Sequence, residues 1–231
     1  MYAKFFKRVL DVVLSVIALI VLLPILIVLT IIGAVAMRGN PFFLQPRPGK
    51  KDKDGREKIF KLIKFRTMSN AKDKDGNFLS DEKRLNKYGM WLRSTSLDEL
   101  PELVNIFMGD LGICGPRPFL VRDCAFMTEE QRRRHNIRPG LTGLAQVNGR
   151  NNITWEKKIE YDLQYIDNGI TFLKDMKIIL QTIGNVLKRN DTVREGTVSD
   201  IDYGDWLMMH GKVTQEEYDK IQQEAKELIA K

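Results

Sequence analysis

Two adjacent carboxylates, Asp98 and Glu99, are the residues of this sequence best suited to chemistry. They follow Arg93-Ser-Thr-Ser-Leu and precede an apolar segment that is typical of a helix. A carboxylate close to cationic side chains can bind Mg2+ and can attack phosphorus to form an acyl phosphate. Alternatively, an Asp-Glu pair at a helix start only stabilises that helix through its dipole. The basic residues elsewhere in the chain favour the first interpretation.

The basic residues between positions 61 and 150 lie in turns rich in glycine and proline. The segments are Lys64-Phe-Arg66-Thr-Met, Gly115-Pro-Arg117-Pro, Arg138-Pro-Gly-Leu-Thr-Gly and Asn148-Gly-Arg150-Asn151. A turn holds side chains and backbone N–H groups in place, which suits guanidinium groups to bidentate phosphate recognition. A solvated run of surface charge would need no glycine or proline. The pattern therefore indicates phosphate ligands, and no nucleic acid is expected because neither an RNP-type aromatic set nor a basic recognition helix is present.

A long apolar segment near the N-terminus predicts a membrane element. Residues 12–35 carry no charge, and as one helix they would be about 36 Å long, enough to cross a bilayer core. The segment is too long for a removable signal peptide, and no small-residue cleavage site follows it. Pro24 lies at its centre, where a proline kinks a helix.

Basic residues flank this segment on both sides, Lys4, Lys7 and Arg8 before it and Arg38 and Arg47 after it. Lys and Arg favour the cytosolic side of a membrane, so a re-entrant helix that bends and leaves on the same face is predicted. A straight single-pass helix with a tolerated proline is the alternative.

The rest of the chain predicts an α/β fold with a small, mostly helical catalytic domain and a short β-hairpin. Strand-like pieces at residues 42–44 and 59–65 flank a turn at residues 49–55. Helices are expected over residues 154–166 and 172–187, and the apolar residues of the second recur every three or four positions. Such a stripe packs on a core or lies on a membrane surface.

Two capping signals complete the prediction of elements. Ser96-Leu97-Asp98-Glu99 fits a capping box, although Pro101 would then lie in the first turns of the helix. Thr214-Gln-Glu-Glu should open a last helix. The predicted organisation is an anchor at residues 1–40, a catalytic domain at residues 41–196 and a C-terminal tail with a short helix at residues 197–231, expected to be an appendage.

Composition narrows the class of partner and the compartment. The chain has 231 residues, with 37 Lys+Arg against 30 Asp+Glu, a net charge of +7 that favours anionic partners. Its two cysteines, Cys114 and Cys124, have no metal-ligand spacing, so neither a disulfide framework nor a zinc finger is expected. A reduced, cytosol-facing chain follows.

Several motifs in a fixed order resemble those of the bacterial sugar transferase family, the small monotopic phosphoglycosyl transferases. They are Lys-Phe-Arg-Thr-Met (64–68), Ser-Leu-Asp-Glu-Leu-Pro (96–101), Gly-Pro-Arg-Pro (115–118) and Arg-Pro-Gly-Leu-Thr-Gly-Leu-Ala-Gln-Val-Asn-Gly-Arg-Asn (138–151). The resemblance extends from Met1 to about Gly196. Within the family the motifs look closest to those of the diacetylbacillosaminyl-phosphate transferases of bacterial protein N-glycosylation.

The resemblance implies a role for individual residues. Asp98 matches the nucleophile and Mg2+ ligand, and Glu99 matches the second member of a catalytic dyad. Arg117 matches a position associated with the uridine nucleotide. The other substrate-binding residues that it implies are Lys64, Arg66, Arg138, Gln146 and Arg150.

The resemblance also implies a reaction and its partners. A sugar 1-phosphate would pass from a UDP-sugar, such as UDP-diacetylbacillosamine or a related acetamido sugar, to undecaprenyl phosphate, through a covalent Asp98 intermediate and with release of UMP. The enzyme would sit in membrane lipid at the cytosolic face of the bacterial inner membrane. Residues 211–218 resemble helical tails that mediate self-association, which would make the protein a homo-oligomer. The two rival functions are a non-catalytic membrane adaptor and a glycosyl transferase that releases UDP.

Two departures from the family pattern fall near functional positions. The family often has Ser-Pro at the break of the anchor, where this chain has Leu23-Pro24. Leu144 stands where Trp is usual. The sugar and the downstream pathway, whether protein glycosylation, capsule or O-antigen, are not specified by any motif.

Overall fold

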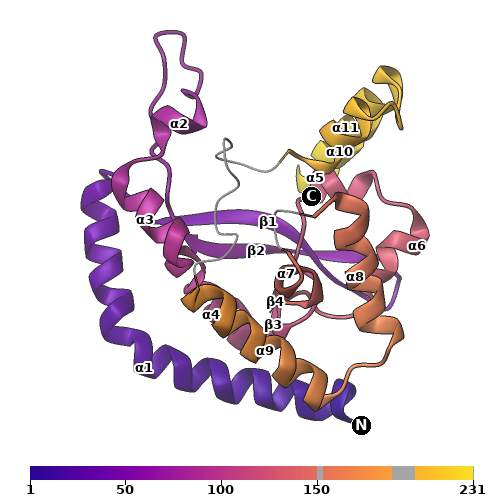
Figure 1. Cartoon of the computed structure of the whole chain (residues 1–231). Coiled ribbons are helices and arrows are strands. Elements are labelled where there is room, and N and C mark those ends of the chain that lie inside the picture. The colour runs from indigo at the N-terminus through magenta and orange to yellow at the C-terminus, as the bar shows by residue number, and fades with distance from the viewer. Residues whose placement is uncertain (150–152, 189–200, 231) are drawn as a thin grey trace.

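In the computed structural model, which describes residues 1–149, 153–188 and 201–230, a long N-terminal helix follows the outside of a mostly helical body that contains a β-hairpin (Figure 1). The expected α/β class with a kinked N-terminal anchor helix is confirmed. The elements that matter for function are this helix, the hairpin and the short helices between them.

Helix α1 (Lys7–Ala36) continues from a π-helical turn, η1 (Tyr2–Phe6), and is bent (Figure 1). Pro24 lies inside α1, where it cannot donate a backbone hydrogen bond. Among the described residues, Tyr2–Ala36 is the one helical segment long and apolar enough to cross a membrane, judged by length and composition. Only 11% of its most apolar stretch is buried, so most of its apolar side chains face away from the body.

Both halves of α1 nevertheless contact the same body. Before the proline, the Arg8 guanidinium donates to the carbonyl oxygens of Ile106 and Phe107 at 2.6 and 2.9 Å. After the proline, the Tyr88 hydroxyl donates to the Leu29 carbonyl at 2.8 Å. A straight helix that left the body to cross a bilayer could not make both sets of contacts. The structure therefore favours the re-entrant geometry over the single-pass alternative.

The predicted hairpin is present and its strands are longer than expected. Strands β1 (Phe42–Lys51) and β2 (Glu57–Phe65) pair antiparallel, with Phe42 opposite Phe65. β1 contains two prolines, Pro46 and Pro48, which have no backbone N–H group to donate. The hairpin is a sheet of its own, and α1 and α4 (Glu102–Met108) pack against the buried side chains of β2.

The remaining elements are mostly short helices. They are α2 (Asp81–Arg84), α3 (Lys87–Thr95), the 3-10 turn η2 (Leu97–Glu99), α5 (Val121–Ala125), α6 (Glu129–Arg132), the 3-10 turn η3 (Arg133–Asn136), α7 (Leu144–Val147), α8 (Trp155–Asp167), α9 (Phe172–Leu187), α10 (Tyr203–Met209) and α11 (Gln215–Ala230). The helices predicted over residues 154–166 and 172–187 are confirmed as α8 and α9. A short parallel pair, β3 (Gly112–Cys114) with β4 (Gly140–Thr142), was not predicted.

Threonine caps explain where three of these helices begin. The hydroxyls of Thr154 and Thr171 accept hydrogen bonds from the backbone N–H groups three residues later, at the starts of α8 and α9. Thr214 caps α11 in the same way, and the Glu217 carboxylate accepts from the Thr214 N–H at 2.8 Å. The predicted capping box at Thr214 is therefore confirmed.

The C-terminal residues, expected to form an appendage, instead contribute to the core. Tyr203 and Leu207 of α10 are buried with Phe119, Phe126 and other residues of the body. Gly204 approaches the Phe126 ring so closely that a Cβ atom there would lie 2.6 Å from a ring carbon. These apolar contacts join α10 to α5 and make residues 201–209 part of the folded body.

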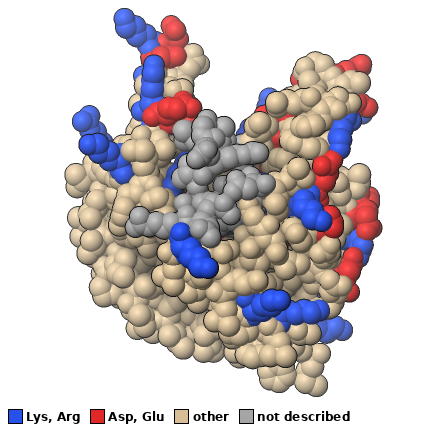
Figure 2. Space-filling view, viewed as in Figure 1, with Lys and Arg blue, Asp and Glu red and all other residues tan. Residues whose placement is uncertain are grey.

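The exposed apolar side chains gather on α1, the end of α4 and one face of α9. On α9 they include Leu173, Leu180 and Leu187, and on α4 Phe107 and Met108. Figure 2 shows that the charged side chains of this view lie mainly on its upper and right parts, whereas the lower left, over α1, is free of them. An apolar face of this kind is typical of a surface that enters the edge of a bilayer.

Candidate active site

The two carboxylates of the predicted dyad lie in η2, between α3 and α4. Ser96 closes α3 in the left-handed conformation, with φ of 56°, and turns the chain into η2. The predicted capping box at Ser96 is wrong, because its side chain caps no helix and α4 begins only after Pro101. The physical reason is that Pro101 suits the residue before a helix, so η2 forms in place of a first helical turn.

Glu99 is held between two cations that come from different elements. Its carboxylate accepts a hydrogen bond from Lys64 of β2 at 3.0 Å and another from Arg117 in the turn after β3. Burial alone would raise the pKa of Glu99, but Arg117 and Lys64 hold it well below its usual range. Glu99 is therefore a fixed anion that orients both cations.

A third carboxylate, Glu102, was missed in the sequence. It is only 1% exposed, and it pairs with Lys64 at 3.1 Å. The oxygen that makes this ion pair, Oε1, is buried, and its only described partner is the Lys64 ammonium. Its position four residues after Asp98 was the available signal, because residues that far apart share one face of a helical segment.

The carboxylates of the cluster shift the pKa values of the two cations. Burial alone would lower the pKa of the Lys64 ammonium, but Glu99 and Glu102 raise it above its usual range. Glu99 also raises the pKa of Arg117. The two cations are therefore charged at neutral pH.

Asp98 differs from Glu99 in lacking a direct partner. Within the described part of the chain its carboxylate makes no hydrogen bond or ion pair, and Lys64 and Arg117 act on it through charge alone. Burial, together with the charge of Glu99, raises the pKa of Asp98 to about 6. At neutral pH the carboxylate is thus mostly ionised, partly desolvated and available to a ligand, which is what a nucleophile requires.

Arg93 is a second residue that was not predicted as part of the site. Its guanidinium donates to the Thr67 hydroxyl at 3.0 Å, and its charge acts on Asp98. Arg93 lies near the end of α3, five residues before Asp98. The turn at Ser96 brings it back towards the carboxylate, and the sequence alone could not predict that turn.

A buried ion pair supports Arg117 from behind. Arg134 of η3 is 1% exposed, pairs with Asp162 of α8 at 2.6 Å, and donates to the backbone carbonyl of Arg117. Its guanidinium also lies over the Phe119 ring, 3.6 Å from the ring centroid. The turn that carries Arg117 is therefore fixed at its backbone, which leaves the Arg117 side chain, 37% exposed, free to meet both Glu99 and a ligand.

Glycines allow the two phosphate-type motifs to pack together. Gly140 lies against the Gly115 segment so closely that a Cβ on it would lie 2.1 Å from the Gly115 nitrogen. The Gly140 N–H donates to the Pro116 carbonyl at 2.9 Å. These contacts join the Gly-Pro-Arg-Pro turn to β4, and explain why both motifs are rich in glycine.

Of the remaining predicted site residues, the three that the structure describes are not bonded to the carboxylates. Arg66 is half-buried, and its backbone N–H donates to the Pro41 carbonyl. Gln146 is buried in α7, with its Oε1 atom unpaired and its amide nitrogen donating to Leu141. Arg138 donates to the Gly109 carbonyl at 2.9 Å, at the opposite end of α4 from Asp98. Arg150 lies outside the described residues.

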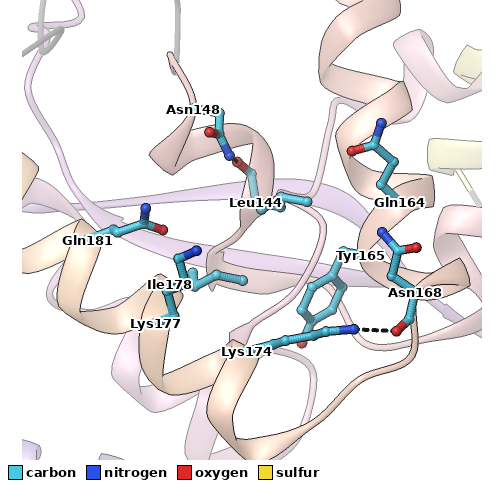
Figure 3. Close-up of a pocket in the computed structure, with 9 residues that line it drawn as sticks. All are labelled: Leu144, Asn148, Gln164, Tyr165, Asn168, Lys174, Lys177, Ile178 and Gln181. Carbon is cyan, nitrogen blue, oxygen red and sulfur yellow. Dashed lines mark hydrogen bonds between the residues drawn. The ribbon is translucent and has the colours of Figure 1, made fainter.

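A cavity lies apart from these carboxylates. It has a volume of about 250 Å³ between α7, α8 and α9, and Tyr165, Lys174 and Lys177 are among its lining residues (Figure 3). No member of the carboxylate cluster lines it. Lys174 points across its mouth and donates to the Gly169 carbonyl at 3.0 Å.

The residues present fit a single Mg2+ ion shared with a ligand rather than an all-protein metal centre. Among the described residues, no group of three or more His, Cys, Asp or Glu side chains is arranged to hold a metal ion. Glu99 and Glu102 are engaged by cations, so Asp98 is the one carboxylate of the cluster with both oxygens open. Mg2+ is commonly bound by one or two carboxylates together with substrate phosphates, which matches this donor set.

Comparison with known proteins gives a consistent family assignment. A family model described as "Bacterial sugar transferase" matches residues 2–189. A protein of Bacillus subtilis (strain 168) named "Uncharacterized sugar transferase EpsL" is 49% identical over 163 residues, which cover 70% of this chain and 78% of that protein.

Two longer relatives carry more specific names. A UDP-glucose:undecaprenyl-phosphate glucose-1-phosphate transferase of Klebsiella pneumoniae is 38% identical over 188 residues, covering 77% of this chain and 39% of that protein. A UDP-galactose-lipid carrier transferase of Erwinia amylovora is 34% identical over 205 residues, covering 81% of this chain and 42% of that protein. The chain thus spans about two fifths of the length of these longer relatives.

Proposed function

This chain belongs to the bacterial sugar transferase family, and from that premise we propose that it is a sugar-1-phosphate transferase that acts on a UDP-sugar and undecaprenyl phosphate and releases UMP. The observation that carries the proposal is the Asp98 carboxylate, which has no bonded partner among the described residues, beside two cations, Lys64 and Arg117, which Glu99 holds in place. The apolar surface of α1 supports it further, because one of the two substrates is a lipid.

The first half-reaction forms a covalent intermediate on Asp98. A carboxylate oxygen attacks the β-phosphorus of the UDP-sugar, a new P–O bond forms, and the bond from that phosphorus to the oxygen bridging to UMP breaks. UMP leaves with the electron pair. Lys64 and Arg117 are placed to neutralise the charge that develops on the phosphoryl oxygens.

Asp98 would hold a Mg2+ ion together with phosphate oxygens of the substrate. The ion would supply charge neutralisation and hold the diphosphate for in-line attack. Glu99 and Glu102 contribute by keeping the two cations fixed rather than by binding the metal ion. The protein thus provides orientation and the nucleophile.

The second half-reaction returns Asp98 to its starting state. A phosphate oxygen of undecaprenyl phosphate attacks the phosphosugar, the acyl-phosphate bond breaks, and a diphosphate links the sugar to the lipid. One phosphoanhydride is consumed and one is formed, so the net reaction needs no other energy source. A covalent intermediate suits this task because the two substrates, one soluble and one confined to the bilayer, then need not bind together.

The anchor supports a place at the cytosolic face of the bacterial inner membrane. Both halves of α1 contact the body, so the apolar surface can enter the bilayer from one side while Asp98 stays near headgroup depth. UDP-sugars are cytosolic, and the basic residues at both ends of α1 favour that side. An acetamido sugar such as diacetylbacillosamine is the expectation from the motifs, whereas the names of the two longer relatives specify UDP-glucose and UDP-galactose.

The decisive experiment follows the nucleotide and the protein mass together. The full chain in detergent or nanodiscs is incubated with Mg2+ and each of a panel of UDP-sugars, first without undecaprenyl phosphate. The accepted sugar should give a stoichiometric burst of UMP and an intact protein mass increased by one phosphosugar. The adduct should disappear when undecaprenyl phosphate is added.

Other results would point to the two rival functions. Release of UDP would indicate direct glycosyl transfer, and no nucleotide release with any sugar would indicate a non-catalytic adaptor. Steady turnover without any adduct would contradict the covalent intermediate and favour a ternary complex.

A further inference from the structure

A small cationic pocket lies at the opposite end of α4 from Asp98. It has a volume of about 70 Å³, roughly the space of two water molecules. Lys7, Arg8, Lys50 and Arg138 are among its lining residues, together with the carboxylate of Asp11. These residues come from α1, β1 and the segment before β4, so the pocket exists only in the folded chain.

The two arginines meet at Gly109, which follows α4. Arg138 donates to the Gly109 carbonyl at 2.9 Å, and Arg8 lies so close that a Cβ on Gly109 would be 3.0 Å from its Nη2 atom. Gly109 has φ of +95°, so glycine is required there both by the backbone and by this contact. The two guanidiniums are thus held side by side by the body of the protein.

The charges of the pocket are only partly neutralised. Lys7 pairs with the buried Asp175, and Asp11 accepts a hydrogen bond from the Ile113 N–H at 3.0 Å. Within the part of the chain that the structure describes, Arg8 and Arg138 bond only to backbone carbonyls, and the exposed Lys50 makes no ion pair. The four cations of the pocket and the two carboxylates, Asp11 and Asp175, together carry a net charge of about +2.

Donor groups remain for a ligand. A guanidinium has five N–H groups. Within the described residues, Arg138 uses the N–H on Nε for its bond to Gly109, so the four N–H groups on its two Nη atoms remain for a ligand. Lys50 contributes a free ammonium. A tetrahedral oxyanion could therefore accept several charge-assisted hydrogen bonds at this place.

Exposed apolar side chains lie within a few residues, along the chain, of the residues that line or contact the pocket. They are Phe5 and Phe6 of η1, Phe107 and Met108 of α4, and Phe172 and Leu173 of α9. Tyr2 and Phe172 are in edge-to-face contact, with ring centroids 6.0 Å apart, which places the start of α9 beside the N-terminus. Figure 1 shows these ends of α1 and α9 together. A cationic pocket with exposed apolar side chains nearby matches the boundary between lipid headgroups and acyl chains.

We propose that this pocket binds the phosphate of an anionic membrane phospholipid, with Arg8, Arg138 and Lys50 around the phosphate and the acyl chains against the nearby exposed apolar side chains. The small volume suits a phosphate group better than a sugar or a nucleotide. The bound lipid fixes the N-terminal end of α1 at headgroup depth. This site goes beyond the proposed reaction and needs neither UDP-sugar nor turnover.

The occupant differs from the reacting acceptor because of distance along α4. Asp98 precedes this helix of seven residues and Gly109 follows it, so the two places are separated by about 10 Å or more. A phosphate bonded at Arg8 and Arg138 could not attack a phosphosugar on Asp98. The lipid at this site is therefore structural.

The test measures lipid binding by the full chain, without UDP-sugar. Purified protein in a neutral detergent is titrated with phosphatidylglycerol, and the bound lipids are counted by native mass spectrometry. The double variant Lys50→Gln/Arg138→Gln should bind the first phosphatidylglycerol on the order of 25-fold more weakly, since each cation near an anionic lipid contributes roughly fivefold. The control Lys74→Gln/Lys83→Gln removes the same charge from two exposed lysines, and should bind like the wild type.

Competition identifies the source of the phosphate. Inorganic phosphate and phosphatidylcholine at the same concentration should displace little of the bound phosphatidylglycerol, because the first lacks acyl chains and the second carries a cation. Undecaprenyl phosphate at equal concentration should leave most of it bound.

Three outcomes would overturn the proposal. Equal binding by the wild type and the pocket variant would remove the pocket as the site. Displacement by inorganic phosphate would make it a general anion site. Full displacement by undecaprenyl phosphate would assign it to the acceptor.

Discussion

The two ends of α4 are both surrounded by charged side chains, yet they are neutralised in opposite ways. Before the helix, the carboxylates of Glu99 and Glu102 are paired with Lys64 and Arg117. After it, Arg8 and Arg138 bond to backbone carbonyls and keep their net charge. Side-chain pairs hold cations in the fixed geometry that group transfer needs, whereas carbonyl contacts leave positive charge available to an anion.

The helix itself favours this division. Negative groups are stabilised at a helix start and positive groups at a helix end, where free carbonyls accept hydrogen bonds. One short helix therefore separates the proposed catalytic end from the end that meets the membrane. The difference predicts that changes at one end should affect turnover and changes at the other should affect the anchor.

The largest effect is expected at the catalytic end. Asp98→Asn keeps the side-chain volume but removes the nucleophile, so UMP release should fall at least ~1000-fold while the melting temperature stays unchanged. The control is Asp110→Asn at the other end of α4, where the carboxylate contacts the exposed Lys58 at 3.3 Å. Its activity should stay within about twofold of the wild type. Substantial turnover by Asp98→Asn would exclude it as nucleophile.

The next effect is expected at the anchor end, in stability rather than chemistry. The Asp175 carboxylate is 3% exposed, pairs with Lys7 at 2.5 Å and accepts hydrogen bonds from the hydroxyls of Tyr2 and Tyr165. Asp175→Asn leaves Lys7 without its counter-charge, so the free energy of unfolding should fall by about 3 kcal/mol in a denaturant titration. Asp167→Asn, in a surface pair with Arg133, should cost less than about 1 kcal/mol. Equal losses for the two variants would contradict the role assigned to Asp175.

A smaller effect concerns pH and the cluster behind Arg117. Burial lowers the pKa of His135 to about 4 in the folded protein, against a usual value of 6.5. The unfolded chain therefore binds a proton below pH 6.5 that the folded protein refuses, and stability is lost as pH falls from about 6.5 towards 4. By pH 5 the loss should be about 2 kcal/mol.

The same measurement on a variant isolates this histidine. His135→Gln should reduce the loss of unfolding free energy between pH 7.5 and pH 5 by about 2 kcal/mol, because it removes the titrating ring. The neighbouring Glu57, whose pKa is held far below its usual range by His135 and Arg132 although burial raises it, loses its contribution only below about pH 4.5. An unchanged pH dependence in the variant would contradict the assignment.

The smallest effect is a shift in the population of the anchor. Single cysteines at residues 3 and 70 should both be shielded from a membrane-impermeant thiol reagent in intact cells and labelled after lysis. The native Cys114 and Cys124 are buried and should stay unreactive. Pro24→Ala restores a backbone hydrogen bond, so a minor fraction of residue 3 should become labelled from outside. Complete external labelling in the Pro24 protein would show that α1 spans the membrane.

The sequence predicted elements well where one local rule decides the structure. The apolar period of residues 172–187 defined α9, and Pro24 within an uncharged run indicated the kinked anchor. The two strand-like pieces on either side of a turn, at residues 42–44 and 59–65, indicated the hairpin. In each case neighbouring residues along the chain carry the information.

The carboxylate cluster was only partly predictable because it depends on contacts between distant segments. Asp98, Glu99, Lys64 and Arg117 were predicted and lie together, but Glu102 was missed because a glutamate in the first turn of a helix has an ordinary explanation. Arg138 was grouped with them by its turn-like setting, although α4 separates it from Asp98. Residues 201–209 were expected in an appendage because so short a segment shows no apolar pattern of its own. Tyr203 and Leu207 are buried by contacts with distant residues of the body, which the segment itself does not reveal.

The two prolines of β1 bear on how this protein behaves when it is crowded in a membrane. Pro46 and Pro48 are two residues apart, so their missing N–H groups fall on the same side of the strand, and β1 still pairs with β2 on its other side. The outer edge of β1 therefore lacks backbone donors at these two positions, which disfavours pairing with another strand there. Confinement to a surface raises local concentration and promotes chain-to-chain sheet growth, and this edge resists it. The protein can accumulate in the bilayer plane without its hairpin serving as a template for polymerisation.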